Sequence, residues 1–442
     1  MRTLIPSILL AAVASAAAAD NWPQWRGPHQ NGVSQATGLP SQWSASEGVL
    51  WKAPLPSWSG GTPIVWGDRV FVTSPSAPEA GPAPAEQGRR RKRDPGGDDL
   101  LLLCLSRADG KELWRAVLAE GNRTWRKHNN TSPSPVTDGN HVWAVTGTGV
   151  VAAFTMEGEP VWRRDLQAEF GEFGLMWGYA SSPALHGGRL IVEVLHGMRT
   201  DAPSYVAAFD GATGELAWRV ERPTDAPAES PDAYTTPAVL STGAGEQIVV
   251  SGGDYLTGHD PASGRELWRV GGLNPGREGN YRIVGSPIAV GGMVYAQSRK
   301  KPLLAFRVGE EGRVGQDDLA WRWEGAGAPD VPTAACDGTR FYMVDDRGLA
   351  TALDARTGRV VWGPERTAQG RVSASPVVAD GKLYVLNEDG VTTVLAAAAE
   401  YGHLATNPLD GSFTLSSPAV AGSQLFIRTA AHLYCIDGSG GG

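Results

Sequence analysis

One short pattern recurs eight times along the chain and constrains its fold more than any other feature. Each copy begins with a Ser-Pro or Thr-Pro step, followed by an apolar strand, a glycine-containing turn and a second apolar strand. The copies start at Thr62-Pro63, Ser134-Pro135, Ser182-Pro183, Thr236-Pro237, Ser286-Pro287, Ser375-Pro376 and Ser417-Pro418, with a degenerate copy at Thr333-Ala334. Most intervals between copies suit one four-stranded unit of about 40 to 50 residues. The repeat therefore predicts the blades of a β-propeller.

A second signature, D-x-x-x-G-x-x-x-W, follows the third strand of several units. It occurs at Asp210-Gly214-Trp218, Asp260-Gly264-Trp268 and Asp354-Gly358-Trp362. The glycine allows the backbone to reverse into a fourth strand, and the tryptophan on that strand is expected to bury its ring against the next unit. The 16 tryptophans, which outnumber the 10 tyrosines and 9 phenylalanines, are consistent with one position that is used repeatedly.

The last unit lacks a fourth strand within its own segment. Residues 432–437 supply its third strand, and the chain then ends in SGSGGG. Trp51-Lys52, ahead of the first unit, has the pattern of a fourth strand, so we expect residues 49–54 to complete the last blade and remove two open sheet edges. Residues 401–406 are expected to fill the corresponding edge of the seventh blade. The predicted fold is all-β: one closed, eight-bladed propeller over residues 49–437.

The segments outside the repeat have their own signatures. Residues 1–19 combine Arg2, an apolar stretch and Ala17-Ala18-Ala19, as in a secretory signal peptide. No cysteine for lipid attachment precedes Cys104, so we expect a periplasmic or secreted protein without an anchor. Residues 20–48 form a leader, and 438–442 are expected to be a flexible tail. The insertion 74–99 in the first blade is rich in Pro, Gly and charge, which predicts a disordered loop.

Composition excludes several classes of protein. The net charge of −8 gives no footprint for nucleic acid, and no apolar stretch, that of residues 1–19 included, is long enough to span a membrane. The three cysteines are too few and too far apart for a disulfide framework or a zinc site, so we expect free thiols. We also expect a monomeric propeller.

Two segments resemble a known repeat family. AFDGATGELAW (208–218) and ALDARTGRVVW (352–362) match the tryptophan-docking motif A-x-D-x-x-T-G-x-x-x-W of quinoprotein propellers, and the leader NWPQWRGPHQNGVS (21–34) resembles a segment common in exported bacterial members. The chain thus resembles the PQQ-like (pyrroloquinoline-quinone repeat) β-propellers over essentially residues 49–437. The resemblance implies two alternatives: a non-catalytic propeller similar to BamB, or a quinoprotein alcohol dehydrogenase that binds pyrroloquinoline quinone with calcium. The adjacent cysteine pair usual in those dehydrogenases is absent.

Candidate functional residues lie on the loops that enter each first strand and on those between the second and third strands. Strand alternation places both sets on one face of the ring, and the residues there differ between blades. Loop positions that vary between blades are better functional candidates than the positions that repeat, because packing does not explain them. They could instead line a water-filled channel. The candidates are Trp58, Asn130, Trp177, Asp232, Tyr234, Asp254, Tyr281, Arg282, Arg299, Arg371 and Arg428.

No catalytic or metal-binding arrangement is evident in the sequence. Our leading hypothesis is an exported, non-catalytic propeller without cofactor that binds a protein, polymer or small ligand on the loop-rich face. The alternative is an oxidoreductase dependent on pyrroloquinoline quinone and calcium, with Asp232 or Asp254 as the base.

Overall fold

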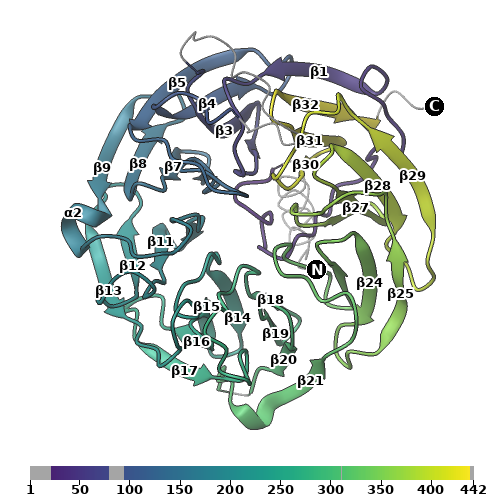
Figure 1. Cartoon of the computed structure of the whole chain (residues 1–442). Helices are drawn as coiled ribbons and strands as arrows, with labels where there is room; N and C mark the ends of the chain where they lie inside the picture. Colours follow the sequence, from purple (N-terminus) through teal and green to yellow (C-terminus); the bar gives the residue numbers. More distant parts are fainter. Residues whose placement is uncertain (1–20, 79–93, 310, 439–442) are drawn as a thin grey trace, which may run out of the picture.

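The computed structural model describes residues 21–78, 94–309 and 311–438. They form a ring of eight four-stranded antiparallel sheets around a central axis (Figure 1). This confirms the predicted all-β, eight-bladed propeller. The signal peptide predicted at 1–19 lies outside the described residues. Within them, no helix is long and apolar enough to cross a membrane.

Blades one to four each consist of four consecutive strands, numbered from the axis outward. Their bounds are β2 (Ile64–Trp66), β3 (Arg69–Pro75), β4 (Leu100–Ser106) and β5 (Glu112–Ala119); β6 (Val136–Thr137), β7 (His141–Val145), β8 (Val150–Thr155) and β9 (Pro160–Asp165); β10 (Ala184–His186), β11 (Arg189–Val194), β12 (Tyr205–Asp210) and β13 (Leu216–Glu221); β14 (Ala238–Thr242), β15 (Gly245–Gly252), β16 (Tyr255–His259) and β17 (Glu266–Val270). A short helix, α2 (Leu166–Phe170), follows blade two.

Blades five to seven repeat this order, and blade eight is closed by the first strand of the chain. The bounds are β18 (Ile288–Val290), β19 (Met293–Gln297), β20 (Leu303–Arg307) and β21 (Leu319–Trp323), with the 3-10 helix η1 (Gln316–Asp318); β22 (Ala335–Cys336), β23 (Arg340–Val344), β24 (Leu349–Asp354) and β25 (Val360–Arg366); β26 (Val377–Ala379), β27 (Lys382–Leu386), β28 (Val391–Ala396) and β29 (His403–Pro408); β30 (Ala419–Ala421), β31 (Gln424–Arg428), β32 (His432–Asp437) and β1 (Val49–Pro54).

The closure of the ring agrees with the sequence prediction. β1 pairs antiparallel with β32, with Trp51 opposite Cys435 and Ala53 opposite Leu433. β29 forms the outer edge of blade seven, two residues later than expected. Cys104, Cys336 and Cys435 are buried free thiols, and burial raises each of their pKa values to about 12.

The repeated Ser/Thr-Pro step has a direct structural reason. The backbone N–H of each Ser or Thr donates to the hydroxyl of the equivalent residue in the next blade, at 2.9 to 3.3 Å. These bonds run from Thr62 through Ser134, Ser182, Thr236, Ser286, Thr333 and Ser375 to Ser417. Between blades eight and one, the Ser416 hydroxyl donates instead to the Gly61 carbonyl. Proline at the following position has no N–H to donate, so in those copies the backbone donor of this step is the Ser or Thr.

Tryptophans on the outer strands pack over glycines of the neighbouring blade. A Cβ added at any of these glycines would lie 2.4 to 2.7 Å from the indole, and each glycine has a positive φ. The pairs are Trp51 with Gly110, Trp114 with Gly158, Trp162 with Gly214, Trp218 with Gly264 and Trp321 with Gly358. The indole N–H also reaches across the boundary, as when Trp218 donates to the Pro261 carbonyl. Trp268 differs, because its N–H donates to Gln247 in its own blade.

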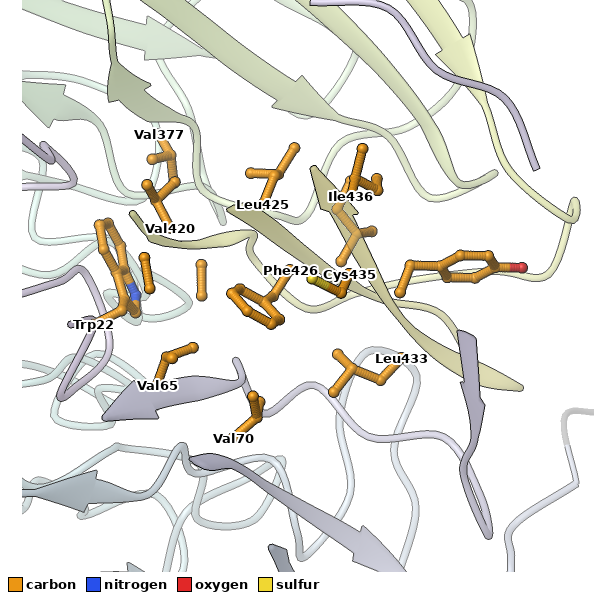
Figure 2. Close-up of a cluster of buried hydrophobic side chains, with 14 of the residues drawn as sticks. Trp22, Val65, Val70, Val377, Val420, Leu425, Phe426, Leu433, Cys435 and Ile436 are labelled. Atoms are coloured by element: carbon orange, nitrogen blue, oxygen red, sulfur yellow. The ribbon is translucent and has the colours of Figure 1, made fainter. Parts of the chain in front are cut away.

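The leader crosses the middle of the ring and is ordered. Trp22 pairs with Val65 of β2, and Ser34 donates to the Val378 carbonyl of β26. Figure 2 shows Trp22 among buried side chains of blades one, seven and eight. Between these ends, the fully buried Arg26 donates to the carbonyls of Pro376 and Ala334 at 2.7 and 2.6 Å. The leader therefore lies across the ring axis at the level of the innermost strands.

Residues at both ends of the insertion predicted at 74–99 are structured. Ser74 and Pro75 continue β3, and Ser76 pairs with Asp99 through its backbone N–H. The Asp94 carbonyl accepts a hydrogen bond from the Trp58 indole, because the segment folds back onto the ring. Residues 79–93, and residues 439–442 of the predicted tail, lie outside the described residues.

Candidate functional site

A cavity of about 940 Å³ opens where the loops of the blades converge. Its wall comes from loops that enter first strands and from the β19–β20 and β23–β24 loops, which is the face that strand alternation predicts. Trp25 of the leader also lines it. The leader thus contributes to the cavity while it occupies the ring axis.

The eleven candidate residues divide between the cavity wall and the protein interior. Five line the cavity: Trp177, Tyr234, Arg282, Arg299 and Arg371. The other six are buried and hydrogen-bonded within the fold: Trp58 to Asp94, Asn130 to Gly121, Asp232 to Met176 and Met198, Asp254 to Asn274, Tyr281 to Lys301, and Arg428 to Ser57. Their polar groups support the loops, because buried donors and acceptors need partners.

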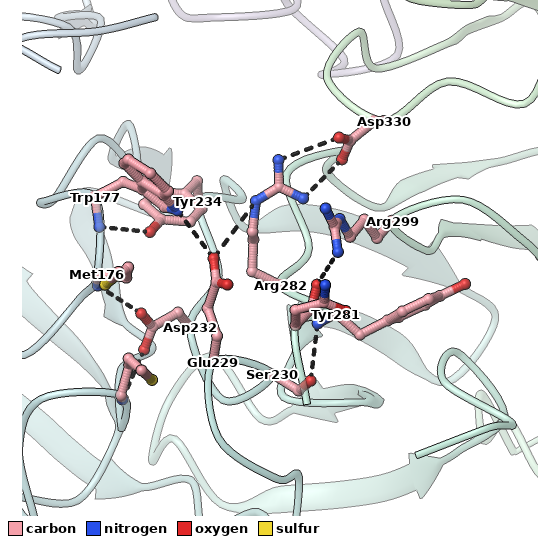
Figure 3. A network of polar contacts seen from close by, with 12 residues as sticks. Met176, Trp177, Glu229, Ser230, Asp232, Tyr234, Tyr281, Arg282, Arg299 and Asp330 are labelled. Atoms are coloured by element: carbon pink, nitrogen blue, oxygen red, sulfur yellow. Dashed lines mark hydrogen bonds and ion pairs between the residues drawn. The ribbon is translucent and has the colours of Figure 1, made fainter. Parts of the chain in front are cut away.

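The loop that carries Trp177 is fixed by side chains of the neighbouring loop, which enters blade four (Figure 3). Asp232 accepts from the backbone N–H of Met176 at 2.6 Å, and burial raises the pKa of its carboxyl to about 6. The Tyr234 hydroxyl accepts from the backbone N–H of Trp177 at 3.1 Å, and Glu229 accepts from its indole N–H at 2.9 Å. Trp177 is nevertheless 42% exposed, so an apolar ring is presented to solvent in a fixed position.

A second set of contacts joins the loops of blades five and six. Arg282 makes two hydrogen bonds to Asp330, at 3.0 and 3.1 Å, and lies 3.8 Å from Glu229. Asp346 accepts from the backbone N–H of Asp330 at 2.8 Å, and burial raises the pKa of Asp346. These contacts fix one side of the cavity.

Part of the wall was missed by sequence reasoning. Trp125 and His128 stack with their ring centroids 4.7 Å apart, and burial lowers the pKa of His128 to about 4. The imidazole is therefore neutral at pH 7. Both residues belong to the loop that enters blade two. They lie further from Pro135 than Asn130, the candidate taken from this loop. The sequence feature that could have revealed them is the presence of two aromatic side chains, Trp125 and His128, on one long loop.

Basic side chains outnumber acidic ones on the cavity wall, whereas the chain as a whole has a net negative charge. Eight basic side chains line the cavity: Arg126, Lys127, Arg282, Arg299, Lys300, Lys301, Arg347 and Arg371. The four acidic ones are Glu229, Asp330, Asp345 and Asp346. A concave, positively charged surface concentrates negatively charged ligands.

The described cavity wall has no cluster of acidic side chains that would hold calcium beside a quinone. In the described parts of the chain, no three His, Cys, Asp or Glu side chains are grouped to hold a metal ion. The four carboxylates of the wall already have protein donors: Trp177 for Glu229, Arg282 for Asp330, Arg347 for Asp345 and backbone N–H groups for Asp346. Calcium needs six to eight oxygen ligands, and these carboxylates would have to share their oxygens with the donors that they already have.

Comparison with known proteins identifies the family. The family model described as outer membrane protein assembly factor BamB matches residues 97–320 and 314–441. BamB of Yersinia pestis is 23% identical over 337 residues, covering 74% of this chain and 77% of that protein. The crystal structure of BamB from Moraxella catarrhalis superposes with a TM-score of 0.53 and 17% identity, covering 76% of this chain and 91% of that one.

A europium-containing methanol dehydrogenase has the same fold, with a TM-score of 0.68 at 13% identity over 95% of this chain and 92% of that one. Likeness at this level of identity extends to the fold alone. The family-model match, in contrast, spans well over half of the sequence. The chain belongs to the family of the outer membrane protein assembly factor BamB, within the PQQ-like propellers.

Proposed function

We propose that this protein is an exported, non-catalytic scaffold that binds a segment of a partner protein in its loop-face cavity. The observation that carries the proposal is Trp177, which is exposed at the cavity although both of its N–H groups are bonded within the protein. The relatives' name, assembly factor, supports a role in binding other proteins.

The geometry of Trp177 suits a binding anchor. Tryptophan, tyrosine and arginine contribute most often to the free energy of protein association, and Trp177, Tyr234 and Arg282 lie together here. The contacts from Asp232, Tyr234 and Glu229 already fix the loop that carries Trp177. This loop would therefore lose little conformational freedom when a partner binds.

The size of the cavity also favours a peptide segment over a very small ligand. Its volume of about 940 Å³ is near the upper end of ligand pockets, which span roughly 300 to 1,000 Å³. A cavity of this size accepts several consecutive side chains of an extended segment.

The test is capture of partner proteins in the native host by the full-length protein and by two variants. Trp177→Ala removes the anchor, and Leu404→Ala removes an apolar side chain of similar exposure (44%) from the outer strand β29. For the captured partner, we expect Trp177→Ala to raise the Kd at least tenfold, as for a residue at an interface centre. We expect Leu404→Ala to leave the Kd unchanged.

Two results would contradict the proposal. One is a partner that binds Trp177→Ala as tightly as the unmodified protein. The other is the absence of any protein captured specifically by the unmodified chain under conditions where it is folded.

A further inference from the structure

We infer that the cavity recognises a protein segment whose carboxylate side chains are spaced apart by apolar or aromatic residues. This inference rests on the proposed function and adds the chemical class of the partner. It follows from how the basic side chains of the wall are distributed and which of them already have acidic partners.

Several basic side chains of the cavity are neutralised within the protein. Arg282 binds Asp330, Lys127 lies 3.1 Å from Glu388, and Arg347 lies 2.9 Å from Asp345. These pairs hold the loops together. Their charges are therefore of limited use for attracting a ligand.

Three others have no carboxylate within ion-pair distance in the described parts of the chain: Arg299, Lys301 and Arg371. Arg299 donates to the backbone carbonyl of Asn280, which directs its guanidinium along the blade-five loops without cancelling its charge (Figure 3). Arg299 and Lys301 lie on the β19–β20 loop of blade five, and Arg371 lies on the loop that enters blade seven. Two positive areas thus flank blade six.

The acidic side chains of the wall lie mainly between these two areas. Asp330, Asp345 and Asp346 all belong to loops of blade six. They lie close to Arg282, Arg347 and Lys127, so blade six offers a ligand no unpaired positive charge between the two areas. A segment with separated carboxylates suits this arrangement, because one carboxylate can pair with blade five and another with blade seven.

The opposite wall is aromatic and suits the apolar residues of such a segment. Trp177, Tyr234 and Trp125 line the cavity on the loops of blades two to four. Arginine forms paired hydrogen bonds with carboxylates, whereas aromatic rings contribute apolar contact area. An acidic peptide with an internal aromatic or aliphatic residue satisfies both walls at once.

The test measures the binding of a fluorescent ten-residue peptide with four glutamates around a central phenylalanine. Its control replaces the glutamates by glutamines. We expect the glutamate peptide to bind at least tenfold more tightly, and this difference to shrink as salt rises, because the attraction is electrostatic.

Matched variants localise the effect to the cavity. Arg299→Gln, Lys301→Gln and Arg371→Gln, combined in one protein, should weaken binding of the glutamate peptide at least tenfold. The control combines Arg265→Gln, Arg356→Gln and Arg359→Gln, which remove the same charge from exposed turns between third and fourth strands, on the opposite face. The control should bind as the unmodified protein does.

Three outcomes would overturn the inference: equal binding of both peptides, equal weakening by the two triple variants, or binding of a uronic-acid polysaccharide in preference to the glutamate peptide. A native partner that still binds the cavity triple variant but not Trp177→Ala would reject the acidic class and leave the proposed function intact. A partner insensitive to Trp177→Ala would reject the proposed function itself.

Discussion

Glu193 of β11 shows how a single buried residue contributes to the pH response of the fold. Its side chain is enclosed, and the Thr235 hydroxyl lies 2.6 Å both from its Oε1 and from the Ser251 carbonyl oxygen. One hydroxyl hydrogen cannot serve two acceptors. Both contacts are satisfied if Glu193 carries a proton and donates to Thr235, which then donates to Ser251. Burial accordingly raises the pKa of Glu193 from 4.5 to about 8.

Glu193→Gln should reduce the pH dependence of stability. Between pH 4.5 and pH 8 the folded protein holds a proton on Glu193 that the unfolded chain has lost, so its contribution falls as pH rises. The slope is roughly 1 kcal/mol per pH unit. Asp232 and Asp254, whose pKa values are raised to about 6, also lower stability as pH rises, and they do so equally in the unmodified protein and in Glu193→Gln. Urea unfolding at pH 5.5 and 7.5 measures the difference, and equal slopes for the two proteins would contradict the prediction.

At the scale of the element, the strand plan was predictable and the side-chain directions on the loops were not. Turn residues and the spacing of apolar residues are local, so the blades and the closing strand β1 follow from the sequence. Loop side chains point according to contacts with distant segments. Arg428, which was expected on a loop, ends strand β31 and is buried, where it donates to the carbonyls of Thr73 and Ser57. The two predicted sets of loops therefore located the cavity, but only five of the candidate residues lie in its wall.

Gly214 offers a test of the contact between blades. Gly214→Ala forces a Cβ to within 2.5 Å of the Trp162 ring at a φ of +73°. We expect a loss of about 2 to 4 kcal/mol, from backbone strain plus displacement of the indole. Gly188→Ala is the control, because Gly188 has a φ of +74° with no atom within 4 Å of the added Cβ. It should cost about 1 kcal/mol. Similar shifts of the urea midpoint for both variants would show that the indole contact contributes little.

At the scale of the whole molecule, the N-terminal part of the described chain holds the ring together in two ways. β1 completes blade eight, and the leader bonds to innermost strands on both sides of the axis. The partners of Arg26 are 308 and 350 residues away in sequence, so no local pattern indicated that the leader occupies the axis. The same segment brings Trp25 into the cavity, which links the integrity of the ring to the shape of the binding site.

Arg26→Lys tests whether the leader stabilises the closed ring. Arg26 is fully buried and its guanidinium donates to two carbonyls, one in blade seven and one in the loop entering blade six. Lysine keeps the charge, but its ammonium lacks the planar arrangement of donors that serves both oxygens. We expect a loss of about 2 to 3 kcal/mol, as for a hydrogen bond to a buried charged group. Arg189→Lys is the matched control, because Arg189 also donates to two carbonyls but at a partly exposed turn, where water can replace it. Urea unfolding followed by tryptophan fluorescence measures both, and an equal loss in the two variants would show that the leader does not stabilise the ring.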